Sequence, residues 1–424
     1  MIRAADLRAV GARTFRSLRI RNYRLFIIGQ LISVTGTWMQ TVAQTWLVVD
    51  LTGSGVDLGV TVALQFLPML LFGMWGGALA DRSDKRRLLI AMQVAGGILA
   101  LILYALVATD TVELWMIYVL AFALGMVTAI DMPARQSFVI EMVGPDEVPN
   151  AVGLNSAMYN SGRIIGPAAA GVTIATLGLA PAFLANAVSF VPVIVALVMM
   201  RPEELFRREP AVRGRGEVRA GLLYAWREPT LRSTLLLVGV LGMFGFNFIV
   251  VLPLLAKFTF GGDAGLYSLF TALMAFGSLS GALISAGRSQ PSAAMLVGSG
   301  LAFGGLVLLT AVAPTAWMAA VVLVAVGMAM MLFMATANTT LQLNSDPAMR
   351  GRVMALYGLL FLGTTPVGGP VMGWIAETWG PRVGLAIGGS LSLAAALAAV
   401  RVRVRRRTAI APGETHDAPD IAVA

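Results

Sequence analysis

Residues 153–171 read GLNSAMYNSGRIIGPAAAG, an apolar stretch in which glycines recur at helical spacing around one arginine. Gly162 and Gly166 lie one turn apart, so a helix here presents a bare stripe that another helix backbone can approach closely. Arg163 lies between them, and a charge inside an apolar span is costly unless it is paired or hydrated. The stretch therefore predicts a closely packed membrane helix whose arginine belongs to a pathway or a switch.

The composition of the whole chain is that of a membrane protein. Of its 424 residues, 58% are hydrophobic and 12% are charged, whereas a soluble domain carries about 25% charged residues. Cysteine is absent and the only histidine, His416, lies in a polar tail, so we expect neither a metal site nor a cofactor. The basic start runs into a full-length apolar span, which favours an uncleaved first span over a signal peptide.

Apolar stretches long enough to cross a bilayer, which needs about 20 residues, divide into two sets. Twelve are predicted, near 24–49, 56–80, 87–108, 114–140, 149–177, 180–200, 232–256, 264–286, 292–312, 315–341, 351–377 and 381–400. We therefore expect an all-α membrane protein with two six-helix bundles, over 24–200 and 232–400. The remaining segments are a basic N-terminus (1–23), a central loop (201–231) with a membrane-surface helix that places Trp226 at the headgroups, and a disordered tail (401–424).

Arginine and lysine gather in alternate loops. The N-terminus, the loop at 82–87, the central loop, the turn at 350–352 and the tail are basic, and the intervening loops hold only Lys257 and Arg382. By the positive-inside rule, both termini face the cytoplasm across the cell (inner or plasma) membrane. Topology and lipid contact thus explain most of the net charge of +9, and the arginines lack the interleaved aromatic residues of a nucleic-acid binder.

The two halves of the chain echo each other. The fifth predicted span contains Gly166-Pro167 followed by Gly171, and the eleventh contains Gly369-Pro370 followed by Gly373. Together with the six-plus-six division, this repeat predicts two homologous bundles with a substrate site between them near the membrane midplane.

The loop after the second span reads GALADRSDKRR, residues 77–87. Asp81 stands at a helix end, where it can accept hydrogen bonds from the N-terminus of a neighbouring helix. The loop resembles the signature loop of the major facilitator superfamily, although Asp84 stands where the family has a second glycine. The alternative is a basic loop that only sets topology. The basic candidates here are Arg82, Arg86 and Arg87.

The opening stretch resembles the antiporter signature of the same superfamily, which marks exporters more than importers. The matching positions are Gly153, Gly162, Gly166, Pro167 and Gly171, with Ala170 in place of one glycine. A generic small-residue packing face is the alternative. Residues 131–139, 148–151 and 350–356 look like the branch that contains the enterobactin exporter and macrolide-type efflux pumps.

This resemblance covers roughly residues 15 to 405. It implies a secondary exporter of small amphiphilic molecules, siderophore-like or drug-like, that works by alternating access as a proton antiporter. Many such antiporters carry an arginine in the fourth span where this chain has Ala121, which leaves the proton mechanism open. We expect a monomer and no enzyme activity. An importer or symporter on the same fold is the alternative. A membrane enzyme or lipid flippase is a third reading, against which stands the lack of a His pair or Ser/His set, and a primary pump would need a phosphate-binding loop.

Asp131, in the fourth span, is the strongest candidate for coupling because acidic residues at membrane depth are scarce. The fourth and fifth spans are antiparallel neighbours, so we expect Asp131 to pair with Arg163 or with the Arg82 and Arg86 cluster, and protonation to loosen the pair. A static pair that holds the bundle together is the alternative. Arg135, from the same stretch, completes the coupling and gating candidates.

The substrate cavity, by resemblance, is lined by the first, fourth, seventh and tenth spans. Polar and flexible side chains suit variable amphiphilic ligands there. Interhelical hydrogen bonding or packing is the alternative role for each of them. The candidates are Gln40, Gln44, Phe244, Asn247, Met331, Met334 and Asn338.

Overall fold

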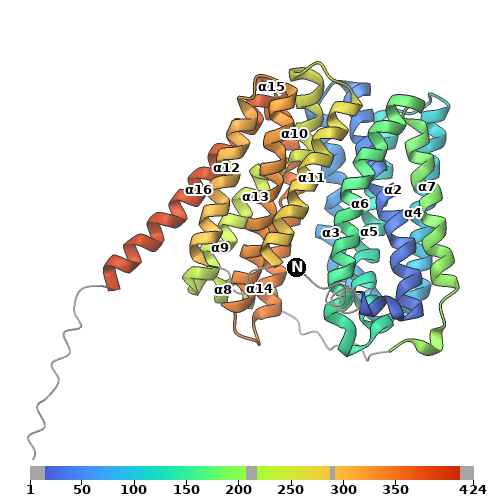
Figure 1. Cartoon of the computed structure of the whole chain (residues 1–424), viewed down its shortest axis with the longest axis horizontal. Coiled ribbons are helices and arrows are strands. Elements are labelled where there is room, and N and C mark those ends of the chain that lie inside the picture. Colours follow the sequence, from blue (N-terminus) through green and yellow to red (C-terminus); the bar gives the residue numbers. More distant parts are fainter. Residues whose placement is uncertain (1–14, 207–216, 287–291, 411–424) are drawn as a thin grey trace, which may run out of the picture.

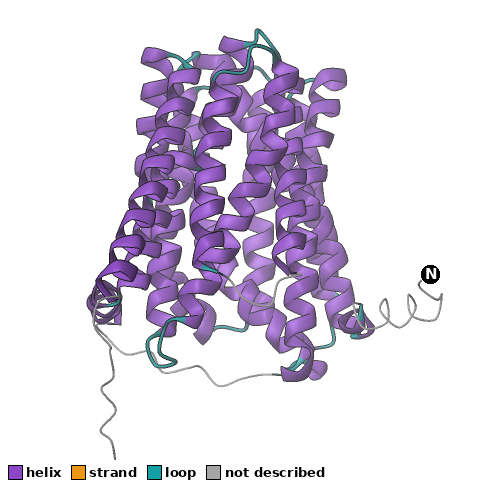
Figure 2. Ribbon diagram, turned by 60° about the vertical axis from the view of Figure 1, so that its left-hand side comes forward, coloured by secondary structure: helices purple, strands orange, loops and turns teal. Residues whose placement is uncertain are grey.

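The computed structural model describes residues 15–206, 217–286 and 292–410, and helices account for nearly all of them (Figures 1 and 2). The first half contains η1 (Arg16–Arg19), α2 (Arg21–Thr52), α3 (Gly55–Arg82), α4 (Lys85–Ala108), α5 (Leu114–Val143), η2 (Pro145–Glu147), α6 (Val148–Leu177), α7 (Ala180–Val198) and η3 (Pro202–Glu204). The second half contains α8 (Glu217–Arg227), α9 (Pro229–Val240), η4 (Leu241–Gly245), α10 (Phe248–Leu254), η5 (Leu255–Thr259), α11 (Ala264–Ala286), α12 (Ala293–Ala311), α13 (Ala316–Leu343), α14 (Arg350–Leu362), α15 (Thr365–Trp379) and α16 (Pro381–Ile410).

Short capped turns connect the long helices. The Ser54 hydroxyl accepts from the Asp57 amide at 3.1 Å and the Asp84 carboxylate from the Arg87 amide at 3.0 Å, so α3 and α4 both begin with a side-chain cap. Gly53, which ends α2, has a φ of 64°, a conformation that favours glycine. These caps allow antiparallel helices to follow one another within a few residues.

Eleven helices in the described part of the chain are long and apolar enough to cross a membrane. The remaining predicted span, the fifth, corresponds to α6, which has 30 residues but is not among the eleven. It carries Asn150, Asn155 and Asn160 in its first half and Arg163 at its middle, and these polar residues lower its hydropathy. The multi-span, all-helical prediction is therefore confirmed, and the count of twelve stays a prediction.

Two predicted spans are not the continuous helices that we expected. The seventh is split by two π-helical segments, η4 and η5, on either side of α10. The eleventh is divided into α14 and α15 at Gly363 and Thr364. In both places glycine or proline follows closely, which weakens the helical hydrogen-bond ladder.

The central loop and the tail also differ in detail from expectation. α8 is a helix where we predicted one, and its place on the membrane surface stays a prediction. Trp226 on it is exposed, with the Arg232 guanidinium carbon 5.9 Å from its ring centroid. The last helix, α16, runs to Ile410 and so extends into the segment that we predicted to be a disordered tail. Residues 1–14 of the basic N-terminus and 411–424 of the tail lie outside the described residues.

The helices form two bundles side by side, α2–α7 on the right of Figure 1 and α9–α16 on the left. We call the end that carries the α3–α4 turn, α8 and the start of α14 the basic end, and the other the opposite end. Each bundle has its own aromatic core. Phe26 and Phe138 are fully buried in the first, with ring centroids 6.1 Å apart, and Phe303 and Phe333 in the second.

The bundles touch along the halves of α3 and α15 that lie toward the opposite end. Glycines make this approach possible, since a Cβ on Gly373 would lie 2.0 Å from the Gly55 carbonyl oxygen, and a Cβ on Gly59 2.5 Å from that of Gly369. Toward the basic end of α3, by contrast, Met74 is 81% exposed. The molecule is therefore closed at the opposite end.

Candidate functional site

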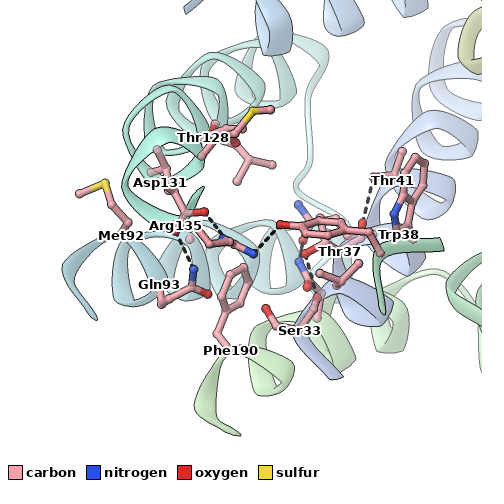
Figure 3. A pocket seen from close by; sticks show the side chains of 18 of the residues that line it. Ser33, Thr37, Trp38, Thr41, Met92, Gln93, Thr128, Asp131, Arg135 and Phe190 are labelled. Carbon is pink, nitrogen blue, oxygen red and sulfur yellow. Dashed lines mark hydrogen bonds and ion pairs between the residues drawn. The ribbon is translucent and has the colours of Figure 1, made fainter. Parts of the chain in front are cut away.

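A cavity of about 550 Å³ lies inside the first bundle (Figure 3). Its walls come from α2, α3, α4, α5, α6 and α7, and Ile249 of α10 is the one lining residue from the second bundle in the described part of the chain. We predicted a cavity between the bundles, so its placement deep in one bundle differs from expectation.

Most of the cavity surface is apolar, although more than half of the lining residues carry a polar side chain. Such a lining suits molecules that carry both an apolar body and a small number of polar groups. The apolar and aromatic side chains include Trp38, Phe66, Met69, Met92, Met132 and Phe190.

Asp131 and Arg135 are the only charged residues among those that line the cavity. They stand one turn apart on α5 and form an ion pair. The other carboxylate oxygen of Asp131 accepts a hydrogen bond of 2.8 Å from the Gln93 side chain on α4 (Figure 3). Asp131 is 7% exposed, so its charge is compensated inside the bundle by a guanidinium and an amide.

The Arg135 guanidinium also links α5 to two further helices. It donates to the Tyr159 hydroxyl on α6 at 2.8 Å and to the Gln30 side-chain oxygen on α2. Four helices thus converge on one buried polar network. A change of charge at Asp131 would alter the polar contacts between these four helices.

The structure contradicts the expected partners of Asp131. Arg163 does not reach it, and its one polar or ring contact in the described part of the chain is with the face of Trp38, 5.5 Å from guanidinium carbon to ring centroid. The Arg82 and Arg86 cluster lies at the basic end instead. Arg135 is the partner because a residue one turn along the same helix needs no precise packing between helices to reach the carboxylate.

Of the seven predicted cavity residues, Gln40 and Gln44 line this cavity. The Gln40 side-chain oxygen accepts a 2.6 Å hydrogen bond from Asn186, which ties α2 to α7. Phe244 and Asn247 instead line a second pocket of about 10 Å³ inside the second bundle. Met331, Met334 and Asn338 line neither pocket, and Asn338 accepts from Gln342 on its own helix at 2.5 Å.

The glycine ladder of α6 packs on two neighbours. Gly162 and Gly166 face α2, where a Cβ would lie 2.6 Å from Val34 and 2.5 Å from the Trp38 side chain. Gly171 faces Ser268 of α11 in the second bundle, and Gly153 has no neighbour within 4 Å of such a Cβ. The ladder therefore holds α6 against α2 and places Arg163 over Trp38, with Pro167 one turn further on.

The signature loop contacts its own bundle at the basic end. The Arg86 guanidinium donates to the carbonyl oxygens of Leu197 and Val198 at 2.6 and 2.7 Å, which caps the C-terminus of α7. Arg82 and Arg87 are exposed, and Asp81 is partly buried beside them.

Sequence reasoning missed an ion pair at the same end. Lys85 and Glu141 lie 2.6 Å apart with both side chains nearly buried. A carboxylate inside the apolar run 138–143 was a usable signal for it. Trp38, Gln93 and Tyr159 were also missed, because nothing in a single sequence places them beside a charged residue from another helix.

Two polar contacts join the bundles at the opposite end. The Glu377 carboxylate of α15 accepts from the Ser54 hydroxyl at 2.7 Å and the Val56 amide at 3.0 Å, at the N-terminus of α3. Lys257 donates to the Asp50 carboxylate at 2.8 Å and the Val49 carbonyl at 3.2 Å, at the C-terminus of α2. The helix dipole favours both contacts, because the negative Glu377 lies at a helix N-terminus and the positive Lys257 at a helix C-terminus.

Sequence comparison relates the chain to known transporters. The profile of the transmembrane secretion effector family matches residues 12–424. The staphyloferrin A transporter of Staphylococcus aureus is 26% identical over 62% of this chain and 66% of its own length. The multidrug efflux pump Tap of Mycolicibacterium fortuitum is 30% identical over 49% and 53%. Macrolide efflux protein A of Streptococcus pyogenes is 22% identical over 90% and 96%. The chain thus spans between half and just under two thirds of the first two relatives.

Solved structures share the fold. The nucleoside transporter NupG superimposes with a TM-score of 0.70 at 12% identity, over 90% of this chain and 99% of that one. A bacterial homologue of the iron transporter ferroportin, in an inward-facing state, gives a TM-score of 0.68 at 14% identity, over 90% and 98%. At these identities the likeness concerns architecture alone.

Proposed function

Since the chain belongs to the transmembrane secretion effector family of the major facilitator superfamily, whose members are transporters rather than enzymes, we propose that it exports small amphiphilic molecules by proton antiport. The relatives named for siderophore, macrolide and multidrug transport support this substrate class. The nucleoside transporter shares only the fold with this chain, so it supports no particular direction or substrate.

The observation that carries the proposal is the buried Asp131–Arg135 pair in the wall of an otherwise mainly apolar cavity. Every other described carboxylate lies in a turn or near a helix end. A proton on Asp131 removes its attraction for Arg135 and frees a guanidinium that also holds α2 and α6. Proton binding is thereby coupled to the packing of the helices that form the cavity.

Alternating access supplies the transport step. The two bundles rock about the glycine contacts between α3 and α15, and the end that is closed here opens in the other state. We place the basic end in the cytoplasm by the positive-inside rule, so this conformation faces inward. We further propose a monomer in the cell membrane. Reporter fusions to the C-terminus test this orientation, since a phosphatase fused there is active only if the tail is outside.

The decisive experiment uses inverted membrane vesicles with an imposed pH gradient and a panel of siderophores, macrolides and cationic dyes. We expect accumulation of at least one class that collapses when a protonophore is added. Asp131→Asn keeps the shape of the side chain but cannot exchange a proton, so gradient-driven accumulation is lost while exchange of substrate down its own gradient persists. Proton-driven transport that is unchanged in this variant would exclude Asp131 as the coupling group.

Glu113→Gln is the matched control. Glu113 is an exposed carboxylate whose partner is Trp115 in the same turn, at 2.7 Å. The variant removes the same charge far from the cavity, and we expect transport to stay at the wild-type level.

A further inference from the structure

Arg163 lies midway along α6 and has no carboxylate partner in the described part of the chain. The carboxylate at the same depth, Asp131, is occupied by Arg135 and Gln93. A guanidinium carries five N–H donors and stays charged at any physiological pH. Its ring contact with Trp38 uses none of these donors, and no other described residue accepts a hydrogen bond from them.

Trp38 connects this arginine to the cavity. Its side chain lines the cavity, and Arg163 stacks over the ring at 5.5 Å. Tyr159, one turn before Arg163 on α6, lines the cavity as well. Arg163 itself is not among the lining residues, so its guanidinium lies next to the cavity, against the face of an indole that does line it.

The position of Arg163 is held by packing. Gly162 and Gly166 press α6 against α2 so closely that a Cβ at either position would collide with Val34 or Trp38. The backbone that carries Arg163 cannot withdraw without separating these helices. The cation is thus a permanent part of this region and not a side chain that relaxes to the membrane surface.

The charges around the cavity do not sum to zero. Asp131 and Arg135 neutralise each other, and the half-buried Arg163 adds one positive charge beside Trp38. A site of this kind attracts an anion and repels a cation, because both effects grow as water is excluded. The glutamines of α2, Gln40 and Gln44, add neutral polar groups that favour neither sign.

We propose that Arg163, stacked on Trp38, is an anion-binding subsite of the transport cavity, and that the substrate is an amphiphile with a carboxylate or a similar anionic group. This inference rests on the proposed transport function and specifies its substrate class. The apolar body of the ligand lies among the aromatic and methionine side chains, and its anionic group meets the guanidinium.

A binding measurement on the purified full-length chain in detergent tests this assignment. Equilibrium dialysis compares 1-naphthaleneacetate with 1-naphthaleneacetamide, two probes of nearly equal shape that differ by one negative charge. A charge-assisted hydrogen bond is worth enough for the acid to bind at least about tenfold more tightly, or about 1.4 kcal/mol. Arg163→Gln removes this preference and leaves the affinity for the amide unchanged, and Arg163→Lys retains part of it.

Arg232→Gln is the matched control, because Arg232 also stacks on a tryptophan, Trp226, but at the basic end and outside the cavity lining. It removes the same charge and leaves the preference for the acid intact. Equal binding of acid and amide to the unmodified chain overturns the proposal, as does a preference that survives in Arg163→Gln. Binding of neither probe to protein with a normal unfolding transition also overturns it. No gradient or direction enters this measurement, so it fails or succeeds separately from the efflux experiment.

Discussion

Asp131 and Arg135 show how a single buried ion pair can connect four helices. Both side chains are nearly enclosed, and each is connected to a different helix through Gln93, Tyr159 or Gln30. The residue type and depth of Asp131 were readable from the sequence, because a carboxylate in an apolar span is rare. Its partner was not, since both Arg135 and Arg163 lay within plausible reach, and only the packing of α6 on α2 turns Arg163 toward Trp38.

Removing one member of the pair is expected to destabilise the protein. Arg135→Gln leaves Asp131 as a buried charge held only by Gln93, which costs about 3–5 kcal/mol of the free energy of unfolding. Asp131→Asn/Arg135→Gln together leave no uncompensated charge and recover part of that loss. Denaturant titration in detergent of the wild type, Asp131→Asn, Arg135→Gln and the double variant measures the free energies of unfolding.

The exposed pair Arg201–Glu204, 3.0 Å apart, is the matched control for this cycle. Arg201→Gln is expected to change the free energy of unfolding by less than about 1 kcal/mol, because water screens that pair. A loss in Arg135→Gln no larger than in Arg201→Gln would show that the buried pair adds nothing to stability.

At the scale of elements, periodicity and apolar length predicted nearly every long helix. They did not predict the breaks in the seventh and eleventh spans, because a π-helical segment or a two-residue interruption leaves the hydrophobic pattern intact. They also did not predict the cavity within the first bundle. Hydropathy marks which helices cross the membrane, whereas the space between them depends on which faces meet, and here α4 and α7 contribute Gln93 and Phe190 to the walls.

The contact between α3 and α15 depends on glycine. Gly373→Ala places a methyl group 2.0 Å from the Gly55 carbonyl oxygen, so we expect the opposite end to open more often. The chain has no cysteine, which allows Ser268→Cys, 2% exposed on α11, to report opening through its rate of thiol labelling. That rate should rise severalfold in Gly373→Ala.

Gly358→Ala in α14 serves as the control, because a Cβ there has no neighbour within 4 Å. Labelling of Ser268→Cys should then match the parent protein. If Gly373→Ala also matches the parent, the glycine contact does not hold the opposite end closed.

At the scale of the whole molecule, two charges of the second bundle contact helix ends of the first bundle at the closed end. Glu377 meets the first turn of α3, and Lys257 meets the last turn of α2. A matched charge at a helix end is worth about 0.3–1 kcal/mol. Such contacts are strong enough to bias the bundles and weak enough to be broken in each transport cycle.

Glu377→Gln is therefore expected to raise the labelling rate of Ser268→Cys about two- to fivefold, the factor that corresponds to the loss of one helix-end charge. Lys257→Met should act in the same direction. Glu113→Gln, at the same end but within one bundle, should leave the rate unchanged. A rate in Glu377→Gln equal to that in Glu113→Gln would show that the Glu377 contact does not bias the bundles.

The cavity lies almost wholly within one bundle, and Ile249 is the single lining residue from the other in the described part of the chain. If each bundle moves as a rigid body, a molecule held there keeps nearly the same neighbours in the inward-facing and the outward-facing state. A ligand biases a conformational equilibrium only through a difference in affinity between the two states. A ligand bound in this cavity therefore does little to shift the equilibrium between the two states. In the mechanism that we propose, proton binding and the contacts between the bundles therefore set the balance between the two states, and release of the substrate depends on which end of the molecule is open.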